Sequence, residues 1–338
     1  MTTPRSIPTL DDVARVAGVS TATVSRCLNE EQKVSAKTRE RVMKVINELG
    51  YTPNFNARAM AAKRTNTIGA IIPTMENAIF ARGLQAFQET LYASGYNLLV
   101  SSSAYQPQLE AEQIRALVAR GADGLLLIGY ARGQEVYDYL ERRGIPTMLA
   151  WASLPDRDHA SVGFDNCAAM RMLADRVLSM GHIRIAVISG IIQGNDRAEG
   201  RLRGIKESVA VHGHDPDQIP VIETSYEIEN GAAAFETLMQ IDPKPTVVMC
   251  GNDVLAAGAI SKAHELGLRI PDDVSITGFD DIELASVLQP QLTTVHVPHR
   301  EMGCIAAKEL IDMVEGRSTG AKQQLAVSIS MRGSLRQI

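Results

Sequence analysis

The stretch that decides the fold of the N-terminal region is TLDDVARVAGVSTATVSRCLN, residues 9–29. Thr9 followed by Asp12 has the spacing of a helix capping box, and Gly18 is expected to end the first helix. Ser20 can cap a second helix, so the stretch predicts two helices joined by a tight turn. This helix-turn-helix pattern is typical of proteins that read the major groove of DNA, although a solvated helical hairpin has the same pattern.

Apolar residues at helical spacing define the inner faces of these two helices. We expect burial of Val13, Val16 and Ala17 on the first helix and of Val24, Cys27 and Leu28 on the second. The outer face of the second helix carries small residues and a single arginine, which suits a helix that enters the major groove. A third helix over 35–49, capped by Ser35 and ended by Gly50, completes a small helical head.

Length and charge indicate that this head is attached to a larger body. At 338 residues the chain exceeds one typical domain of about 150 residues. Residues 1–64 hold eleven basic and six acidic side chains, whereas the rest of the chain holds 23 basic and 33 acidic ones. A basic head on an acidic body is typical of a DNA-contacting module joined to a domain with another task.

No targeting or membrane-spanning segment is evident. The N-terminal residues MTTPRSIPTL lack the apolar core of a secretory signal, and no apolar run approaches the roughly 20 residues that span a bilayer. The four cysteines form no C-x-x-C pair, and we expect reduced, buried thiols. These features predict a cytoplasmic protein with no membrane contact. The four cysteines are Cys27, Cys167, Cys250 and Cys304.

Between head and body lies YTPNFNARAMAAKRTNT, residues 51–67. Asn54 can cap a short Ala-rich helix that ends near Ala62. Isolated helices below about 12–15 residues are marginal, so we expect a hinge that orders only when docked. A plain linker is the alternative.

From Ile68 onward, short apolar strands alternate with amphipathic helices, which is the pattern of parallel α/β folds. Two such sets predict two doubly wound parallel lobes, and a last helix over about 298–315 returns to the first lobe. A final strand is expected around 325–329, with no leucine heptad and hence no tetramerisation helix after it.

The expected domains are 1–52 for the head, 53–66 for the hinge and linker, 67–164 plus 297–326 for the first lobe, and 165–292 plus 327–338 for the second lobe. The space between two such lobes is a usual place for a small ligand.

The chain as a whole resembles the lactose-repressor (LacI/GalR) family of bacterial transcription regulators. The motifs that carry the resemblance are the stretch at 9–29, VSAKTRERVMKVINELGYTPN, RTNTIGAIIP, DGLLLI, the GND of 251–253, IPDDVSITGFDD and QPQLTTV. The resemblance implies a helix-turn-helix head and a body like the periplasmic binding proteins. It also implies a homodimeric repressor that binds a pseudo-palindromic operator in double-stranded DNA under control of a small effector.

The resemblance also implies which residues contact DNA. Bases in the major groove would be read by Thr21, Ala22 and Arg26. Phosphates would be contacted by Ser20, Thr23, Ser25, Asn29, Ser35, Thr38, Tyr51 and Asn54. In the hinge, Ala57 and Arg58 would line the minor groove, and Met60 stands where the family inserts a leucine between base pairs.

In the cleft, the resemblance places Arg201 as the effector clamp, with Asp280 and Asn252 as polar partners and Tyr226, Phe80 and Ile79 as lining residues. Such a set suits a sugar-like compound. The stretches VGFDN (162–166) and PHREMG (298–303) resemble gluconate-type repressors and favour a sugar acid. The residues alone leave other roles open: Asn252 or Asp253 could cap a helix, the Asp280–Asp281 pair could simply end a strand, and Arg201 could pair with Glu199 or Glu207.

The sequence gives little support for an enzymatic function or a metal site. It has no G-x-G-x-x-G after a strand, no P-loop and no G-x-S-x-G elbow. His212 and His214 resemble a metal pair but lie in a probable loop, HGHDPDQ, and His296 and His299 have no acid or cysteine partner at metal-ligand spacing. We expect both pairs to be structural or solvated. We therefore expect no enzyme, metal or cofactor. The competing class is a two-lobe carbohydrate-binding protein without regulatory DNA binding, which should have a signal peptide and no basic head.

Overall fold

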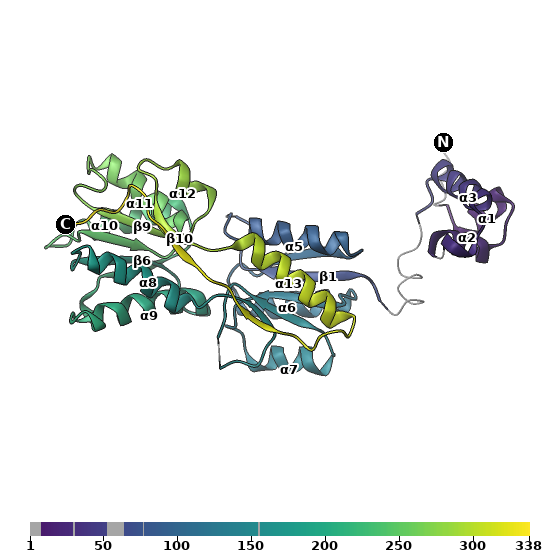
Figure 1. Ribbon diagram of the computed structural model, residues 1–338, viewed down its shortest axis with the longest axis horizontal. Coiled ribbons are helices and arrows are strands. Elements are labelled where there is room, and N and C mark those ends of the chain that lie inside the picture. Colours follow the sequence, from purple (N-terminus) through teal and green to yellow (C-terminus); the bar gives the residue numbers. More distant parts are fainter. Residues whose placement is uncertain (1–7, 30, 53–63, 77, 155) are drawn as a thin grey trace. The chain divides into compact units, whose positions relative to one another are not determined.

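The computed structural model describes residues 8–29, 31–52, 64–76, 78–154 and 156–338. The chain divides into two compact units, residues 1–65 and 66–338 (Figure 1). The first unit is the helical head and the second is the two-lobe body. The hinge helix expected from Asn54 lies outside the described residues.

Three helices form the head: α1 (Leu10–Ala17), α2 (Thr21–Asn29) and α3 (Ala36–Leu49), with a short 3-10 turn over Glu31–Lys33. The predicted capping box is confirmed, because the Thr9 hydroxyl accepts the Asp12 N–H at 3.3 Å and the Asp12 carboxylate accepts the Thr9 N–H at 3.0 Å. Gly18 and Gly50 end α1 and α3 with φ of 63° and 65°, as expected for C-terminal glycines.

The head has a small apolar core of its own, contributed by all three helices. Its buried members are Val13, Ala14, Ala17, Val24, Cys27, Val42, Val45 and Ile46. The expectation for Val16 is wrong, since this side chain is 51% exposed. At about 100° per residue, Ala14 and Val16 lie on opposite sides of the direction shared by Val13 and Ala17. Leu10, which packs against the same core, lies on the side of Ala14, so Val16 faces outward.

The sheet of the first lobe is parallel throughout, with the strand order β11-β5-β4-β3-β1-β2. Its strands are β1 (Thr67–Ile72), β2 (Asn97–Ser102), β3 (Gly124–Ile128), β4 (Thr147–Ala150), β5 (Ser161–Gly163) and β11 (Lys322–Gln324). Helices α5 (Ala81–Ala93) and α13 (His299–Val314) cover one face, and α6 (Pro107–Ala119) and α7 (Gln134–Arg142) cover the other (Figure 1).

The sheet of the second lobe has the order β12-β10-β9-β8-β6-β7, and only the β10–β12 pair is antiparallel among the strand pairs of the described residues. Its strands are β6 (Ile185–Gly190), β7 (Val221–Thr224), β8 (Val247–Cys250), β9 (Ser275–Asp280), β10 (Thr293–His296) and β12 (Ser328–Ser330). Its helices are α8 (Asn166–Ser179), α9 (Asp196–Val211), α10 (Ile228–Leu238), α11 (Asp253–Glu265) and the short α12 (Glu283–Val287). The predicted class, a helical head followed by two doubly wound α/β lobes, is confirmed.

The chain crosses between the lobes three times within the described residues, and the crossings explain where the sequence analysis was wrong. They are the β5–α8, β10–α13 and β11–β12 connections. The single final strand expected around 325–329 is instead two short strands, β11 and β12, one in each sheet. The residues between them pass from lobe to lobe, and Leu325 is buried at the junction rather than in a strand ladder. The strands β5 and β10, of three and four residues, were also missed, and each lies directly before a crossing between the lobes.

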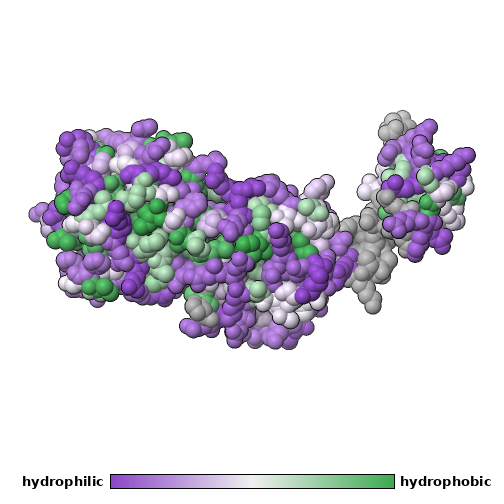
Figure 2. All heavy atoms as spheres, in the orientation of Figure 1, coloured by the Kyte–Doolittle hydropathy of each residue, from purple (hydrophilic) through white to green (hydrophobic). Residues whose placement is uncertain are grey.

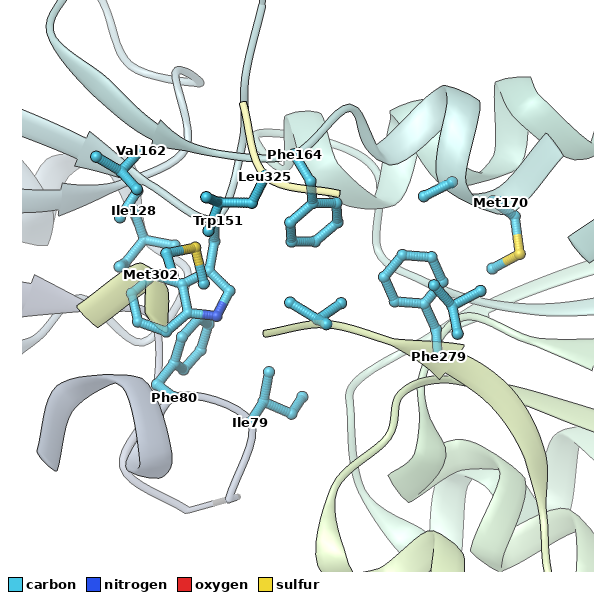
Figure 3. Close-up of a cluster of buried hydrophobic side chains, with 14 of the residues drawn as sticks. Ile79, Phe80, Ile128, Trp151, Val162, Phe164, Met170, Phe279, Met302 and Leu325 are labelled. Atoms are coloured by element: carbon cyan, nitrogen blue, oxygen red, sulfur yellow. The ribbon is translucent and has the colours of Figure 1, made fainter. Parts of the chain in front are cut away.

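One hydrophobic core continues from the first lobe into the second through the crossing segments. Figure 3 shows Phe80, Trp151 and Met302 on the first-lobe side and Phe279 and Met170 on the second-lobe side. The rings of Phe164 and Phe279 stack with centroids 5.9 Å apart. Burial of these large rings between the lobes is an apolar contribution to their docking.

The described residues contain no helix that is long and apolar enough to cross a membrane. On the face of the molecule in Figure 2, apolar residues form small patches interrupted by hydrophilic ones.

Close packing of α8 against α9 fixes the position of the helix that carries Arg201. A Cβ on Gly204 would overlap the carbonyl oxygen of Cys167, whereas a Cβ on Gly200 would lie 3.3 Å from the Cβ of Asn166. The backbones of the two helices therefore approach more closely at Gly204 than at Gly200.

We expect Gly204→Ala to destabilise the body by about 1–3 kcal/mol, because the added methyl group meets backbone that cannot shift cheaply. Gly200→Ala is the matched control on the same helix. There the gain in helix propensity, about 1 kcal/mol, should offset the mild crowding. Urea unfolding followed by circular dichroism measures both, and equal stability of the two variants would contradict this account.

Candidate functional site

The first candidate site is the exposed face of α2 in the head. Ala22 and Arg26 are exposed and lie one helical turn apart, opposite the buried Val24 and Cys27, while Thr21 is half-buried at the start of the helix. A short side chain next to a long cationic donor is the arrangement that a major groove accepts. The geometry is therefore compatible with the base-reading role that the sequence predicts.

The residues predicted to contact phosphates have varied surroundings in the head. The Ser20 hydroxyl accepts the Thr23 N–H at 3.2 Å, and the Ser35 hydroxyl accepts the Thr38 N–H at 3.3 Å, so both serines cap helices. Tyr51 packs against the core of the head. Ser25 is half-buried on α2, and the side chain of Asn29 is not described. Asn54, Ala57, Arg58 and Met60 lie outside the described residues.

The second candidate site is a cleft between the two lobes of the body. Its residues follow the carboxyl ends of parallel strands: Phe80 after β1, Tyr226 after β7 and Asp280 at the end of β9. This is the edge at which open α/β sheets bind their ligands. We call the space between these residues the inner chamber. It has a volume of about 20 Å³ and is lined by Ile79, Phe80, Tyr105, Trp151, Asn195, Arg197, Arg201, Tyr226 and Asp280.

Arg201 lies at the centre of this site, on the buried face of α9, with 6% of its surface exposed. Its guanidinium donates to Asn166 Oδ1 at 2.9 Å and to the Gly251 carbonyl at 2.7 Å, and it lies 3.5 Å from Asp280 Oδ1. It also stacks 3.8 Å from the centre of the Phe279 ring. Arg201 thus pairs with Asp280 rather than with Glu199 or Glu207, the alternatives that the sequence left open.

The hydrogen bonds of Arg201 belong to a closed ring of five buried residues that joins the lobes. Trp151 Nε1 donates to His299 Nδ1 at 3.2 Å, and His299 Nε2 donates to the Asp280 carbonyl at 3.1 Å. Asn166 closes the ring, because its amide donates to the Trp151 carbonyl at 3.0 Å while its oxygen accepts from Arg201. Since Nδ1 accepts and Nε2 donates, the His299 ring is neutral. Burial lowers the pKa of His299, which also favours the neutral form.

Asp280 combines strained backbone with an unsatisfied side chain. Its φ is 103° and that of Asp281 is 53°, values that non-glycine residues rarely adopt. The turn is held by the buried Asp253, whose carboxylate accepts the Ile282 N–H at 2.8 Å and the Thr294 hydroxyl at 2.6 Å. Asp280 Oδ2 is buried and has no hydrogen-bond partner within the described part of the chain. A buried acceptor beside a chamber is therefore available for a donor on a ligand.

The first lobe supplies an aromatic and apolar wall. The Phe80 ring meets the Trp151 ring edge-on with centroids 5.3 Å apart, and Ile79 lies beside them (Figure 3). All three are at least 94% buried. Tyr226 of the second lobe is half-buried, and desolvation raises its pKa, so its phenol stays a hydrogen-bond donor.

Asn252 is the predicted effector residue that does not line the inner chamber. Its side-chain oxygen accepts the Leu255 N–H at 2.9 Å and so caps α11, the other role that the sequence allowed. Its amide nitrogen is buried without a partner among the described residues.

Four lining residues were missed by the sequence analysis: Tyr105, Trp151, Asn195 and Arg197. Arg197 could have been found, because it lies one helical turn before Arg201 and shares its face of α9. Asn195 is the residue that caps this helix, accepting the Ala198 N–H. Tyr105 and Trp151 have φ of 56° and 63° in turns without glycine, and nothing in the sequence signals these conformations.

His296 and His299 each have specific partners. His296 Nδ1 lies 2.9 Å from the Asp281 carboxylate, which also pairs with Arg332 at 2.7 Å. This pairing is between β10 and the turn after β9, segments that are distant in sequence. His299 belongs to the buried ring, so both side chains have structural contacts, one of the two roles expected for them. Among the described residues, no group of three or more His, Cys, Asp or Glu side chains could hold a metal ion.

Comparison with known proteins matches both units of the chain. The model for bacterial regulatory proteins of the lacI family matches residues 9–54, and the model for a periplasmic binding protein-like domain matches residues 174–335. The HTH-type transcriptional repressor PurR of Vibrio atlanticus (strain LGP32) is 33% identical over 312 residues, which are 91% of this chain and 92% of that protein.

Solved structures agree with these matches. A LacI family transcriptional regulator from Silicibacter pomeroyi has a TM-score of 0.89 and 27% identity, with 97% of this chain and 99% of that chain covered. The lac repressor dimer bound to operator and the anti-inducer ONPF has a TM-score of 0.85 and 27% identity, with 97% and 98% covered.

The chain belongs to the lacI family of bacterial regulatory proteins. It is a transcriptional repressor with a DNA-binding helix-turn-helix head and a ligand-binding body. The relatives named above are transcriptional regulators and not enzymes.

We expect Arg201→Ala to destabilise the body by about 3–5 kcal/mol, because it leaves the buried Asp280 carboxylate without its cation. Arg203→Ala is the matched control. Arg203 lies two residues away on α9 and its side chain is 55% exposed beside Glu207, so its loss should cost less than about 1 kcal/mol. Urea unfolding of both variants measures this. Similar losses in the free energy of unfolding would mean that the buried ring contributes little to stability.

Proposed function

We propose that this repressor binds a pseudo-palindromic operator as a homodimer and that a small sugar-like effector in the inner chamber controls its affinity for DNA. The observation that carries the proposal is the unpartnered Asp280 Oδ2, buried beside Arg201 in a chamber made by both lobes. A ligand that satisfies this acceptor contacts both lobes at once and can therefore favour one arrangement of the lobes over another.

The chemistry of the chamber favours a hydroxylated, acidic compound, such as a sugar acid. A ligand hydroxyl can donate to Asp280, and the Tyr226 phenol can donate to a ligand oxygen. Arg197 is 8% exposed and brings a second guanidinium to the same chamber as Arg201, which suits a carboxylate. Phe80 and Trp151 present ring faces and edges that suit the apolar side of a sugar ring.

For the head, we propose that Thr21, Ala22 and Arg26 read bases, while the predicted hydroxyl and amide side chains contact phosphates. Two heads in a dimer would match two half-sites of the operator. In the hinge, Ala57 and Arg58 would line the minor groove and Met60 would wedge between base pairs, as apolar side chains of this kind can do.

The coupling between effector and DNA follows from the two states of the body. An effector that changes the angle between lobes would change the distance between the two hinge segments of the dimer, and so whether they dock in the minor groove. The resulting change in operator affinity is limited to the effector's differential affinity for the two states, typically about 1–3 kcal/mol per site.

The experiment is a binding titration of the purified full chain on a symmetric duplex from its own upstream DNA. It is repeated with a panel of sugars, sugar acids, phosphorylated sugars and nucleobases. One compound that shifts operator affinity supports the proposal, and the sign of the shift distinguishes inducer from co-repressor. Weak, salt-dependent and sequence-independent binding under all conditions would reject it and favour a carbohydrate-binding protein without regulatory DNA binding.

We expect Arg26→Ala to cost about 1–3 kcal/mol of operator binding and to relax specificity at one base pair of each half-site. The control is Arg15→Ala, which removes the same charge from the exposed end of α1. It should weaken binding to all sequences equally, if at all. Competition binding with operators mutated at single positions tests this, and a uniform loss for Arg26→Ala would make Arg26 a phosphate contact.

We expect Asp280→Asn to weaken the active compound of the panel at least tenfold, because the amide keeps the shape of the carboxylate but loses its negative charge. Asp281→Asn is the matched neighbour, since Asp281 pairs with Arg332 and does not line the chamber. Quenching of Trp151 fluorescence can follow binding, because this is the single tryptophan of the chain. Equal affinity of the Asp280 variant and the wild type would remove Asp280 from the effector site.

A further inference from the structure

Tyr105 is held in an unusual conformation at the tip of the turn after β2. It and Ala104 have φ of 56° and 49°, and strained positions of this kind cost about 1–3 kcal/mol each. Backbone hydrogen bonds fix the turn: the Ser103 N–H donates to the Ile72 carbonyl at 2.9 Å, and the Gln106 N–H donates to the Ser103 carbonyl at 2.8 Å. Because the turn is costly and well held, the position of the Tyr105 side chain is specified rather than incidental.

The Tyr105 ring extends from the first lobe to Tyr226 of the second lobe. The two ring centroids are 5.9 Å apart, at an angle of 41°. Tyr226 lies directly on Gly190, where any Cβ would overlap its ring. Tyr226 therefore has no room to retreat into its own lobe, and Tyr105, at the tip of a turn, is the member of the pair that can move.

This aromatic pair separates two spaces in the cleft. On one side is the inner chamber with Arg201 and Asp280. On the other side is an outer chamber of about 240 Å³, whose remaining lining includes Ile191, Gln193 and Thr224. Tyr105, Asn195 and Tyr226 line both chambers and so form the partition between them.

The sizes of the two chambers decide what the partition does. The inner chamber, about 20 Å³, holds no more than about one water molecule while Tyr105 is in this position, whereas the outer chamber is about 240 Å³. A ring that moves from the outer chamber to Arg201 and Asp280 therefore has to pass through the position of the Tyr105 side chain.

We propose that Tyr105 is a gate, which closes the inner chamber in this conformation and has to swing aside before a ring can reach Arg201 and Asp280. This inference rests on the proposed effector site. It adds a residue that controls access to the site, separate from the polar groups that select ligands by chemistry.

The single tryptophan of the chain allows a test that needs no known effector. Trp151 lines the inner chamber and is 1% exposed, so a quencher must enter the chamber to reach it. Two neutral quenchers of different size are used on the full chain without DNA: acrylamide, and the ring-shaped nitroxide 4-hydroxy-TEMPO. Excitation at a wavelength selective for tryptophan removes the contribution of the tyrosines.

The main variant is Tyr105→Gly, since glycine adopts positive φ without penalty and should keep the turn. Tyr105→Asn is the second variant if the first does not fold, because asparagine also tolerates this region. We expect either variant at least to double the quenching constant of the nitroxide and to raise that of acrylamide less. Tyr105→Phe keeps the ring and should match the wild type, as should Tyr92→Ala, which removes a 78% exposed tyrosine of α5.

Unchanged nitroxide quenching in the folded Tyr105 variants would overturn the proposal. An increase in Tyr226→Ala but not in the Tyr105 variants would assign the partition to Tyr226 alone and would also overturn it. The result is independent of the operator titration, because quenching requires neither effector nor DNA. The gate can therefore be rejected while the regulatory function stands, and the reverse also holds.

Discussion

The arrangement of the body depends on the buried hydrogen-bond ring of Trp151, His299, Asp280, Arg201 and Asn166. A charged arginine and a carboxylate in an apolar junction are tolerated only because each has partners of fixed geometry. The ring includes residues from both lobes and borders the inner chamber, so a ligand that engages Asp280 or Arg201 acts directly on the contact between lobes. The binding site and the interlobe joint are thus built from the same side chains.

Backbone strain is concentrated around this ring. Tyr105, Trp151, Asp280 and Asp281 all have positive φ without being glycine, and the first three line the inner chamber. Strain of this kind persists where the surrounding structure fixes it, and it places side chains before a ligand arrives. The deep burial of Asp253, Phe80 and Trp151 provides that support. These side chains are therefore preorganised, and one of the strained turns carries Tyr105.

The sequence predicted the helices and long strands well, because caps such as Thr9 and Ser35 and apolar periodicity are local signals. It did not predict β5, β10 or the division of the last strand, since pairing of such short segments is decided by distant neighbours. The family resemblance indicated Arg201 and Asp280, which the structure brings within 3.5 Å of each other. Tyr105 and Trp151 were not predicted as lining residues, because they reach the chamber through turns with unusual φ. The predicted burial of Val16 was wrong because the direction of the buried face of its helix was misjudged.

The three crossings between lobes also determine the order in which the protein can fold during synthesis. Helix α13, whose Met302, Ala306 and Leu310 complete the core of the first lobe, is made only after nearly all of the second lobe. The second lobe in turn lacks β12 until residue 330 has been added. Domains usually fold one after another as they leave the ribosome. Here neither lobe can finish first, so the part of the first sheet that α13 covers stays without its partner helix until residues 299–314 have been made.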